Sequence, residues 1–151
     1  MRKTLTTVFG LILLSGCAYL GAAHYDELFG EEQPRERVVA ASTLEGAEFL
    51  SDVKPILDTR CVVCHGCYDA PCQLKLSSVE GIDRGLSKER VYDGTRLLAQ
   101  EPSRLLFDAT TTAQWREKGF TPVLNERVQT EEANLAGSVL YNSLVLKQSS
   151  P

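Results

Sequence analysis

A cluster of cysteines, RCVVCHGCYDAPC from Arg60 to Cys72, constrains this chain more than any other feature of its sequence. Four of the five cysteines and one of the two histidines lie within it. Thiols at this density hold a haem, a zinc ion or an iron–sulfur cluster, or they pair as disulfides. The chain must fold around whichever of these it carries, and the rest of the sequence decides between them.

The N-terminus has the layout of a secretory signal. The basic residues Arg2 and Lys3 precede an apolar run from Leu5 to Leu14,. This run is too short to span a bilayer, which takes about 20 apolar residues. We therefore expect residues 1–16 to be removed during export to the periplasm.

Leu14-Ser15-Gly16-Cys17 closes the apolar run as a lipobox does. We expect the thiol of Cys17 to be diacylated and to anchor the protein to a membrane. Ala18 after the cysteine favours the outer membrane, and a plain signal peptide cut near Ala22 or Ala23 is the alternative. Residues 17–41, rich in Ala, Gly and charge, are expected to form a tether.

Cys61-Val62-Val63-Cys64-His65 matches the attachment motif of c-type haem,. Thiols at Cys61 and Cys64 can each add across one vinyl group of a porphyrin to form thioethers. His65 then supplies the proximal nitrogen to the iron. Export agrees with this interpretation, because covalent haem attachment takes place outside the cytoplasm with the cytochrome c maturation machinery. The predicted cofactor is haem c.

Other ligands remain as alternatives at this stage. Cys61, Cys64, Cys67 and Cys72 approach an iron–sulfur spacing, and the same thiols with His65 could bind zinc. A thioredoxin-type redox pair would need a βαβ context that the sequence lacks. For Cys67 and Cys72 we expect a small disulfide beside the haem, with a redox pair near the iron as the alternative.

The sixth ligand of the iron is not evident from the sequence. The single methionine is Met1, which leaves with the signal, and the second histidine is His24 on the tether. A distal His24 would make a small periplasmic electron-transfer cytochrome. An open or weakly held iron would instead allow chemistry on a substrate, and this favours an enzyme.

The expected fold is mainly α, with a cytochrome c-like haem-binding segment near residues 42–75 and long irregular connections. Ser42 and Glu45 form a predicted capping box for a helix that reaches Cys61 and is interrupted near Pro55. Thr112 is expected to begin a helix that ends at Gly119. Thr130 is expected to begin a last helix over residues 131–147, with its apolar face in the core.

The charge excludes one class of partner. The chain has 20 acidic and 16 basic residues, for a net charge of −4. Loss of Arg2 and Lys3 with the signal would make it more acidic. With no basic patch, the chain is not expected to bind nucleic acid.

The stretches VKPILDTRCVVCHGCYDAPCQLKLSSVEGIDRG, VYDGTRLL, WREKGFTPVLNER and ANLAGSVLY resemble the bacterial fatty acid cis/trans isomerases. The resemblance runs from about Val53 to Leu146. It implies a periplasmic c-type haem protein in which Cys61 and Cys64 carry the haem and His65 acts through its iron. The implied substrates are unsaturated fatty acids or the acyl chains of membrane phospholipids, turned from cis to trans without moving the double bond.

The resemblance also implies a mechanism and a difference in size. Ferric iron withdraws electron density from the double bond, rotation becomes possible, and the electron returns. Family members are several times longer, so residues 42–151 resemble a truncated haem domain from their N-terminal part. Of the family's properties, haem binding is expected of this chain, and activity would depend on whether the remaining residues suffice.

Overall fold

The computed structural model describes residues 2–66, 70–89, 92–93, 96–97 and 100–149. The chain forms two compact units, Met1–Gln33 and Pro34–Pro151. The described residues are mainly helical, as the sequence predicts, with one short pair of strands.

The first unit consists of α1 (Arg2–Ala23) and α2 (Tyr25–Phe29). The predicted lipidation site, Cys17, is exposed on α1. The rings of Tyr25 and Phe29 pack with their centroids 4.7 Å apart. Within the described residues, no helix combines the length and apolarity needed to cross a membrane.

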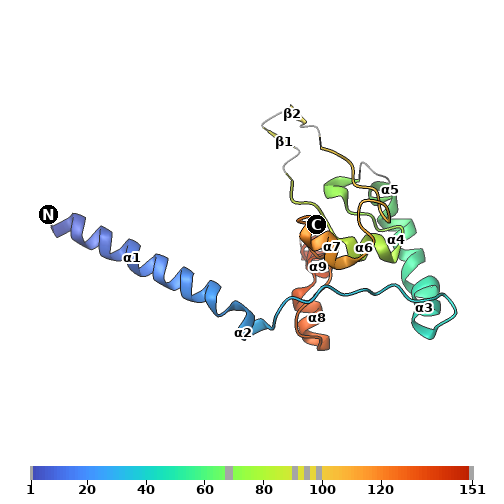
Figure 1. The fold of residues 1–151 in the computed structure, drawn as a ribbon, viewed down its shortest axis with the longest axis horizontal. Coiled ribbons are helices and arrows are strands. Elements are labelled where there is room, and N and C mark those ends of the chain that lie inside the picture. Colours follow the sequence, from blue (N-terminus) through green and yellow to red (C-terminus); the bar gives the residue numbers. More distant parts are fainter. Residues whose placement is uncertain (1, 67–69, 90–91, 94–95, 98–99, 150–151) are drawn as a thin grey trace. The chain divides into compact units, whose positions relative to one another are not determined.

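The second unit is built from short helices joined by irregular segments (Figure 1). Its antiparallel strands pair Tyr92 with Leu97 and Asp93 with Arg96. The elements, in order, are α3 (Leu44–Glu48), the π-helix Phe49–Val53, α4 (Lys54–Arg60), α5 (Val62–His65), the 3-10 helix Pro71–Gln73, α6 (Val79–Arg84), β1 (Tyr92–Asp93), β2 (Arg96–Leu97), α7 (Thr112–Glu117), α8 (Glu131–Gly137) and α9 (Val139–Ser149).

Proline dictates how the first helix of this unit is built. α3, the π-helix and α4 follow one another without a break, and Pro55 lies in the first turn of α4. The interruption predicted near Pro55 is therefore a π-turn, in which the Lys54 N–H donates to the Phe49 carbonyl. Pro55 has no N–H to donate to the preceding turn, and this interrupts the regular α-helical bonding at that point,.

Two helix starts lie one residue away from their predicted positions. Thr43, not Ser42, caps α3, and its hydroxyl accepts from the Gly46 N–H at 3.1 Å. Likewise Thr111, not Thr112, caps α7, where it forms a capping box with Gln114. Adjacent hydroxyl residues can each cap a helix, and the backbone geometry selects one of them.

The C-terminal helix differs more from expectation. Thr130 caps α8 as predicted, but Ser138 divides the expected single helix into α8 and α9. The Ser138 hydroxyl donates to the Val123 carbonyl at 3.2 Å and accepts from the Tyr141 N–H at 3.1 Å. The predicted core face of α9 is wrong, because Leu144 and Leu146 are 59% and 67% exposed.

The core of the second unit combines residues from its N-terminal and C-terminal parts. One cluster consists of Leu57, Leu74, Leu76, Ile82 and Val123. A second cluster consists of Ala109, Trp115 and Phe120. The guanidinium of Arg84 lies 5.6 Å from the Trp115 ring and 5.4 Å from the Phe120 ring, within cation–π range,.

Residues 36–41, here called the strap, bind along this unit. The Arg37 N–H and guanidinium donate to the two oxygens of Asp83 at 2.6 and 2.9 Å. The guanidinium also donates to the Asn125 carbonyl at 2.8 Å. The segment expected to be a tether therefore includes a part, from Pro34 onward, that belongs to the second unit.

Candidate functional site

The predicted haem-attachment motif, Cys61 to His65, lies where α4 gives way to α5. The Cys61 N–H donates to the Leu57 carbonyl at 2.8 Å, and the His65 N–H donates to the Cys61 carbonyl at 2.9 Å. Both thiols thus come from one turn of the chain. Cys61 is half-buried against the core, whereas Cys64 is exposed. Two accessible thiols at this spacing are what thioether formation to one porphyrin needs.

The imidazole of His65 is held by the backbone. Its Nδ1 lies 3.1 Å from the Leu74 carbonyl oxygen, and the Leu76 N–H donates to the His65 carbonyl at 2.8 Å. A carbonyl accepts only from a protonated Nδ1, so this contact selects the tautomer whose Nε2 carries a free lone pair. Metal-binding histidines in proteins are commonly oriented in this way.

These residues fit a c-type haem. The motif supplies two thiols from one turn and one imidazole nitrogen with a fixed tautomer, and haem needs no further protein ligand on that side. In the described part of the chain, no three His, Cys, Asp or Glu side chains lie close enough together to hold a metal ion. Cys67 is outside the described residues, so the four-cysteine alternatives remain untested.

The other predicted site residues are distributed as follows. Cys72 is exposed, and its disulfide with Cys67 stays a prediction because Cys67 is not described. His24 lies in the first unit, where its Nδ1 is 2.6 Å from Glu27. The two units are not placed relative to one another, so a distal role for His24 is untested.

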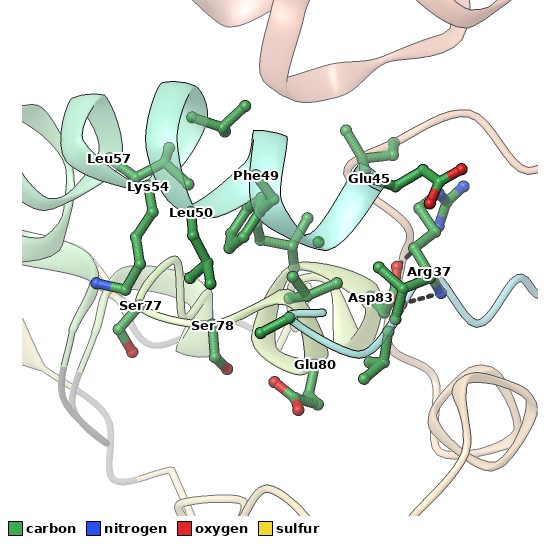
Figure 2. Close-up of a pocket in the computed structure, with 18 of the residues that line it drawn as sticks. Arg37, Glu45, Phe49, Leu50, Lys54, Leu57, Ser77, Ser78, Glu80 and Asp83 are labelled. Atoms are coloured by element: carbon green, nitrogen blue, oxygen red, sulfur yellow. Dashed lines mark hydrogen bonds and ion pairs between the residues drawn. The ribbon is translucent and has the colours of Figure 1, made fainter. Parts of the chain in front are cut away.

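A cavity of about 600 Å³ opens beside the first helix of the second unit (Figure 2). Its walls come from the strap, from α3 to α4, from the start of α6 and from the C-terminal part of the unit. The lining residues are Arg37, Val38, Val39, Ala41, Glu45, Gly46, Phe49, Leu50, Val53, Lys54, Leu57, Ser77, Ser78, Val79, Glu80, Ile82, Asp83, Leu124 and Leu140.

The cavity and the haem motif are separate but adjacent. Cys61, Cys64 and His65 do not line the cavity. Leu57 connects the two sites, since its side chain lines the cavity and its carbonyl accepts from the Cys61 N–H. One helix therefore presents apolar side chains to the cavity and then leads directly into the attachment motif.

A buried carboxylate pins the strap over one end of the cavity. Asp83 is 3% exposed. Burial raises the pKa of Asp83 above its usual value, and the hydrogen bonds and positive charge of Arg37 offset part of that rise,. The charge of Arg37 lies directly against this carboxylate, so the pair closes that end of the cavity with little net charge.

A second ion pair braces the unit behind α6. Arg116 donates to both oxygens of Glu126 at 2.8 and 2.7 Å. Its guanidinium also donates to the carbonyls of Asp83 and Arg84, at the C-terminal end of α6. Glu126 is 2% exposed, so this is a buried bidentate pair whose hydrogen bonds are shared with the backbone,.

Comparison with known proteins places the C-terminal third of the chain. Residues 100–151 match the family model of the fatty acid cis/trans isomerases (CTI). The resemblance seen in the sequence is confirmed over this stretch, which includes α7, α8 and α9. No curated protein and no solved structure matches the chain. The isomerase match begins after the cysteine cluster and does not include it.

The isomerase-matching segment and the cysteine cluster nevertheless share one core. Val123 packs in the same cluster as Leu57 and Leu74. The Ser103 hydroxyl and N–H both donate to the side-chain carbonyl of Gln73, at 2.6 and 2.9 Å. These contacts make the motif and the family segment parts of one folded body.

The sequence predicts the candidate ligands Cys61, Cys64 and His65 but not the groups that surround them. The Leu74 carbonyl is a backbone group, so the residue type at position 74 does not indicate its role. The strap lies in the segment that the sequence predicts as a tether, because that segment is rich in charge and has no clear period. Two adjacent valines in that charged stretch, Val38 and Val39, were the available signal, and both line the cavity.

Proposed function

We propose that this chain is a haem protein that converts cis double bonds of fatty acyl chains to trans, or the haem-binding part of such an enzyme. The supporting observation is a combination within one core. A segment that matches the isomerase family packs against a CxxCH motif whose histidine has a fixed tautomer. Within this proposal, residues 42–75 form the cytochrome c-like part.

The chain's own residues would hold and orient the cofactor. Cys61 and Cys64 would form the two thioethers, and His65 Nε2 would ligate the iron. The Leu74 carbonyl would keep the ring oriented and increase the basicity of that nitrogen. A bound haem would supply an iron that can withdraw electron density from a double bond, so that rotation about it becomes possible.

The proposal includes a setting outside the cytoplasm. The signal at residues 1–16 would direct export, and the cytochrome c maturation machinery would attach the haem in the periplasm. Acylation at Cys17 would keep the enzyme at a membrane, with the outer membrane favoured. Its substrates, unsaturated fatty acids or phospholipid acyl chains, would then lie close by.

The test is the trans-to-cis ratio of membrane fatty acids in a bacterium that lacks an isomerase. The chain is expressed with the maturation machinery under solvent stress, and haem staining shows whether the protein is loaded. We expect trans chains to appear and His65→Ala to return them to background. A matched control, His24→Ala, changes the other histidine and is expected to leave the ratio unchanged.

Two other outcomes are informative in different ways. A band that stains for haem without trans chains would contradict isomerase activity of this chain alone and would leave it as the haem-binding part of such an enzyme. A band that does not stain, with trans chains still formed, would rule out the haem at Cys61 and Cys64 as the catalytic group.

A further inference from the structure

We propose that the cavity beside α4 binds one long-chain fatty acid, with its hydrocarbon tail between the strap and the first helix and its carboxylate at the Lys54 end. This inference deepens the proposed function and rests on it for the choice of an acyl ligand. The position and orientation of that ligand rest on the cavity itself.

The walls of the cavity are largely aliphatic, and these side chains remain partly exposed to solvent. Leu50 and Val53 face it from the first helix, and Val38 and Val39 face it from the strap. These four side chains are 44–47% exposed. Half-exposed aliphatic side chains on two facing walls favour an apolar occupant, because its insertion removes both walls from water.

The size of the cavity suits a small molecule. Its volume of about 600 Å³ lies within the range of roughly 300–1,000 Å³ that is common for ligand sites. Seven of the lining residues recur on one side of the first helix from Glu45 to Leu57, so the cavity extends along this helix. A single unbranched chain matches this shape better than a bulky ring system does.

The polar residues of the cavity lie in separate groups, and their positions predict the orientation of the ligand. Lys54, Ser77 and Ser78 lie together in Figure 2, away from Arg37 and Asp83. Arg37 and Asp83 are paired with each other. Lys54 pairs with Asp58, but an ammonium has three donors, and 36% of the Lys54 side chain remains exposed,.

The acidic residues of the rim favour the Lys54 end. Glu45 lies near Arg37 in Figure 2, and Glu80 lies along the lower edge, next to Ser78 in this view. Their carboxylates would repel an anionic head group in those places. A carboxylate at the Lys54 end would therefore be bound by the Lys54 ammonium and the Ser77 hydroxyl.

Equilibrium dialysis of the haem-loaded full chain against radiolabelled oleate tests the site directly. We expect one oleate per chain. Leu50→Trp should fill the cavity and weaken binding by at least about tenfold. Its control, Ile56→Trp, adds the same side chain to the same helix at a position that is 62% exposed and outside the cavity. It should bind as the unchanged chain does.

A second variant protects the result against misfolding. Val39→Trp fills the cavity from the strap instead of the helix, so it should weaken oleate binding as Leu50→Trp does. Failure of the unchanged chain to bind oleate overturns the inference. Equal binding by both cavity-filling variants and by Ile56→Trp also overturns it, since oleate would then be bound elsewhere on the surface.

The head-group position has its own comparison. Lys54→Glu should weaken oleate binding, whereas Lys147→Glu on α9 should not, and methyl oleate should bind more weakly than oleate. Equal binding of oleate and its methyl ester would overturn the assigned orientation. Phosphatidylcholine vesicles form a third arm, and retention of the chain on them with displacement of oleate would identify a phospholipid chain as the occupant instead.

The inference and the proposed function can fail separately. If oleate binds with the expected pattern among the variants but no trans chains form, the binding site is supported and the isomerase activity is contradicted. If trans chains form but neither Leu50→Trp nor Val39→Trp affects oleate binding, the activity is supported and this site is contradicted.

Discussion

At the scale of single residues, a backbone carbonyl orients the side chain of the predicted iron ligand. His65 is oriented by the carbonyl of Leu74, and the Leu74 side chain is part of the core. Packing of one residue therefore fixes the tautomer of another. The arrangement depends on the fold around Leu74, which explains why the motif sequence alone does not contain it.

Asp83 makes a prediction about the pH dependence of stability. Burial raises its pKa in the folded protein above the ordinary value of 3.8, so the folded state binds this proton more readily than the unfolded chain does. Its contribution to stability is thus present at low pH and is lost as the pH rises through the raised pKa. Asp83→Asn should abolish this loss, as measured by urea unfolding at a series of pH values.

The control for this measurement is Asp58→Asn, which removes an exposed carboxylate of the same type. We expect its free energy of unfolding to follow the pH profile of the unchanged chain. Parallel profiles for the unchanged chain and Asp83→Asn would contradict the assignment of the pH dependence to Asp83.

At the scale of elements, the strap and α3 are in close contact. A Cβ placed on Gly46 would lie 2.2 Å from the Ala40 carbonyl oxygen, which is a backbone atom that cannot turn aside. Gly46→Ala should therefore displace the strap and lower the free energy of unfolding by about 1–3 kcal/mol. Glu48→Ala, at an exposed position of α3, is the matched control and should change it by less than about 0.5 kcal/mol.

Urea unfolding measures both variants, and proteolysis locates the effect. Cleavage after Arg35 or Arg37 should become faster in Gly46→Ala than in Glu48→Ala, because the strap must leave the surface to be cut. Unchanged cleavage with lowered stability would show that the crowding is relieved by the helix and not by the strap.

The elements also show how far the sequence predicts the fold. Local signals located the starts of α3, α7 and α8, since Thr130 caps α8 as expected and the other two predicted caps are one residue off. The face of α9 was mispredicted for a physical reason. An apolar stripe reports that a surface can be buried, but the packing partner is set elsewhere in the chain.

At the scale of the whole molecule, features built from neighbouring residues could be predicted from the sequence, and features built from distant residues could not. Cys61, Cys64 and His65 lie within five consecutive residues, so their spacing could be recognised directly. The cavity combines residues from Arg37 to Leu140. Its walls are held together by the contacts of Arg37 with Asp83 and Asn125 and by the shared core, none of which has a sequence pattern.

The shared core predicts how a covalently bound haem would affect the stability of the chain. Cys61 packs against the cluster that contains Leu57 and Val123, so a haem bonded there would add apolar contacts to the core in the folded state alone. The chain made without the maturation machinery should unfold at least about 5 °C below the haem-loaded chain, since 1 kcal/mol corresponds to roughly 2–8 °C for domains of this size. Differential scanning calorimetry measures this difference, and Cys64→Ala, which keeps the half-buried thioether, should lie closer to the loaded chain. Coincident transitions for loaded and unloaded protein would mean that the haem lies on the surface and that the core is complete without it.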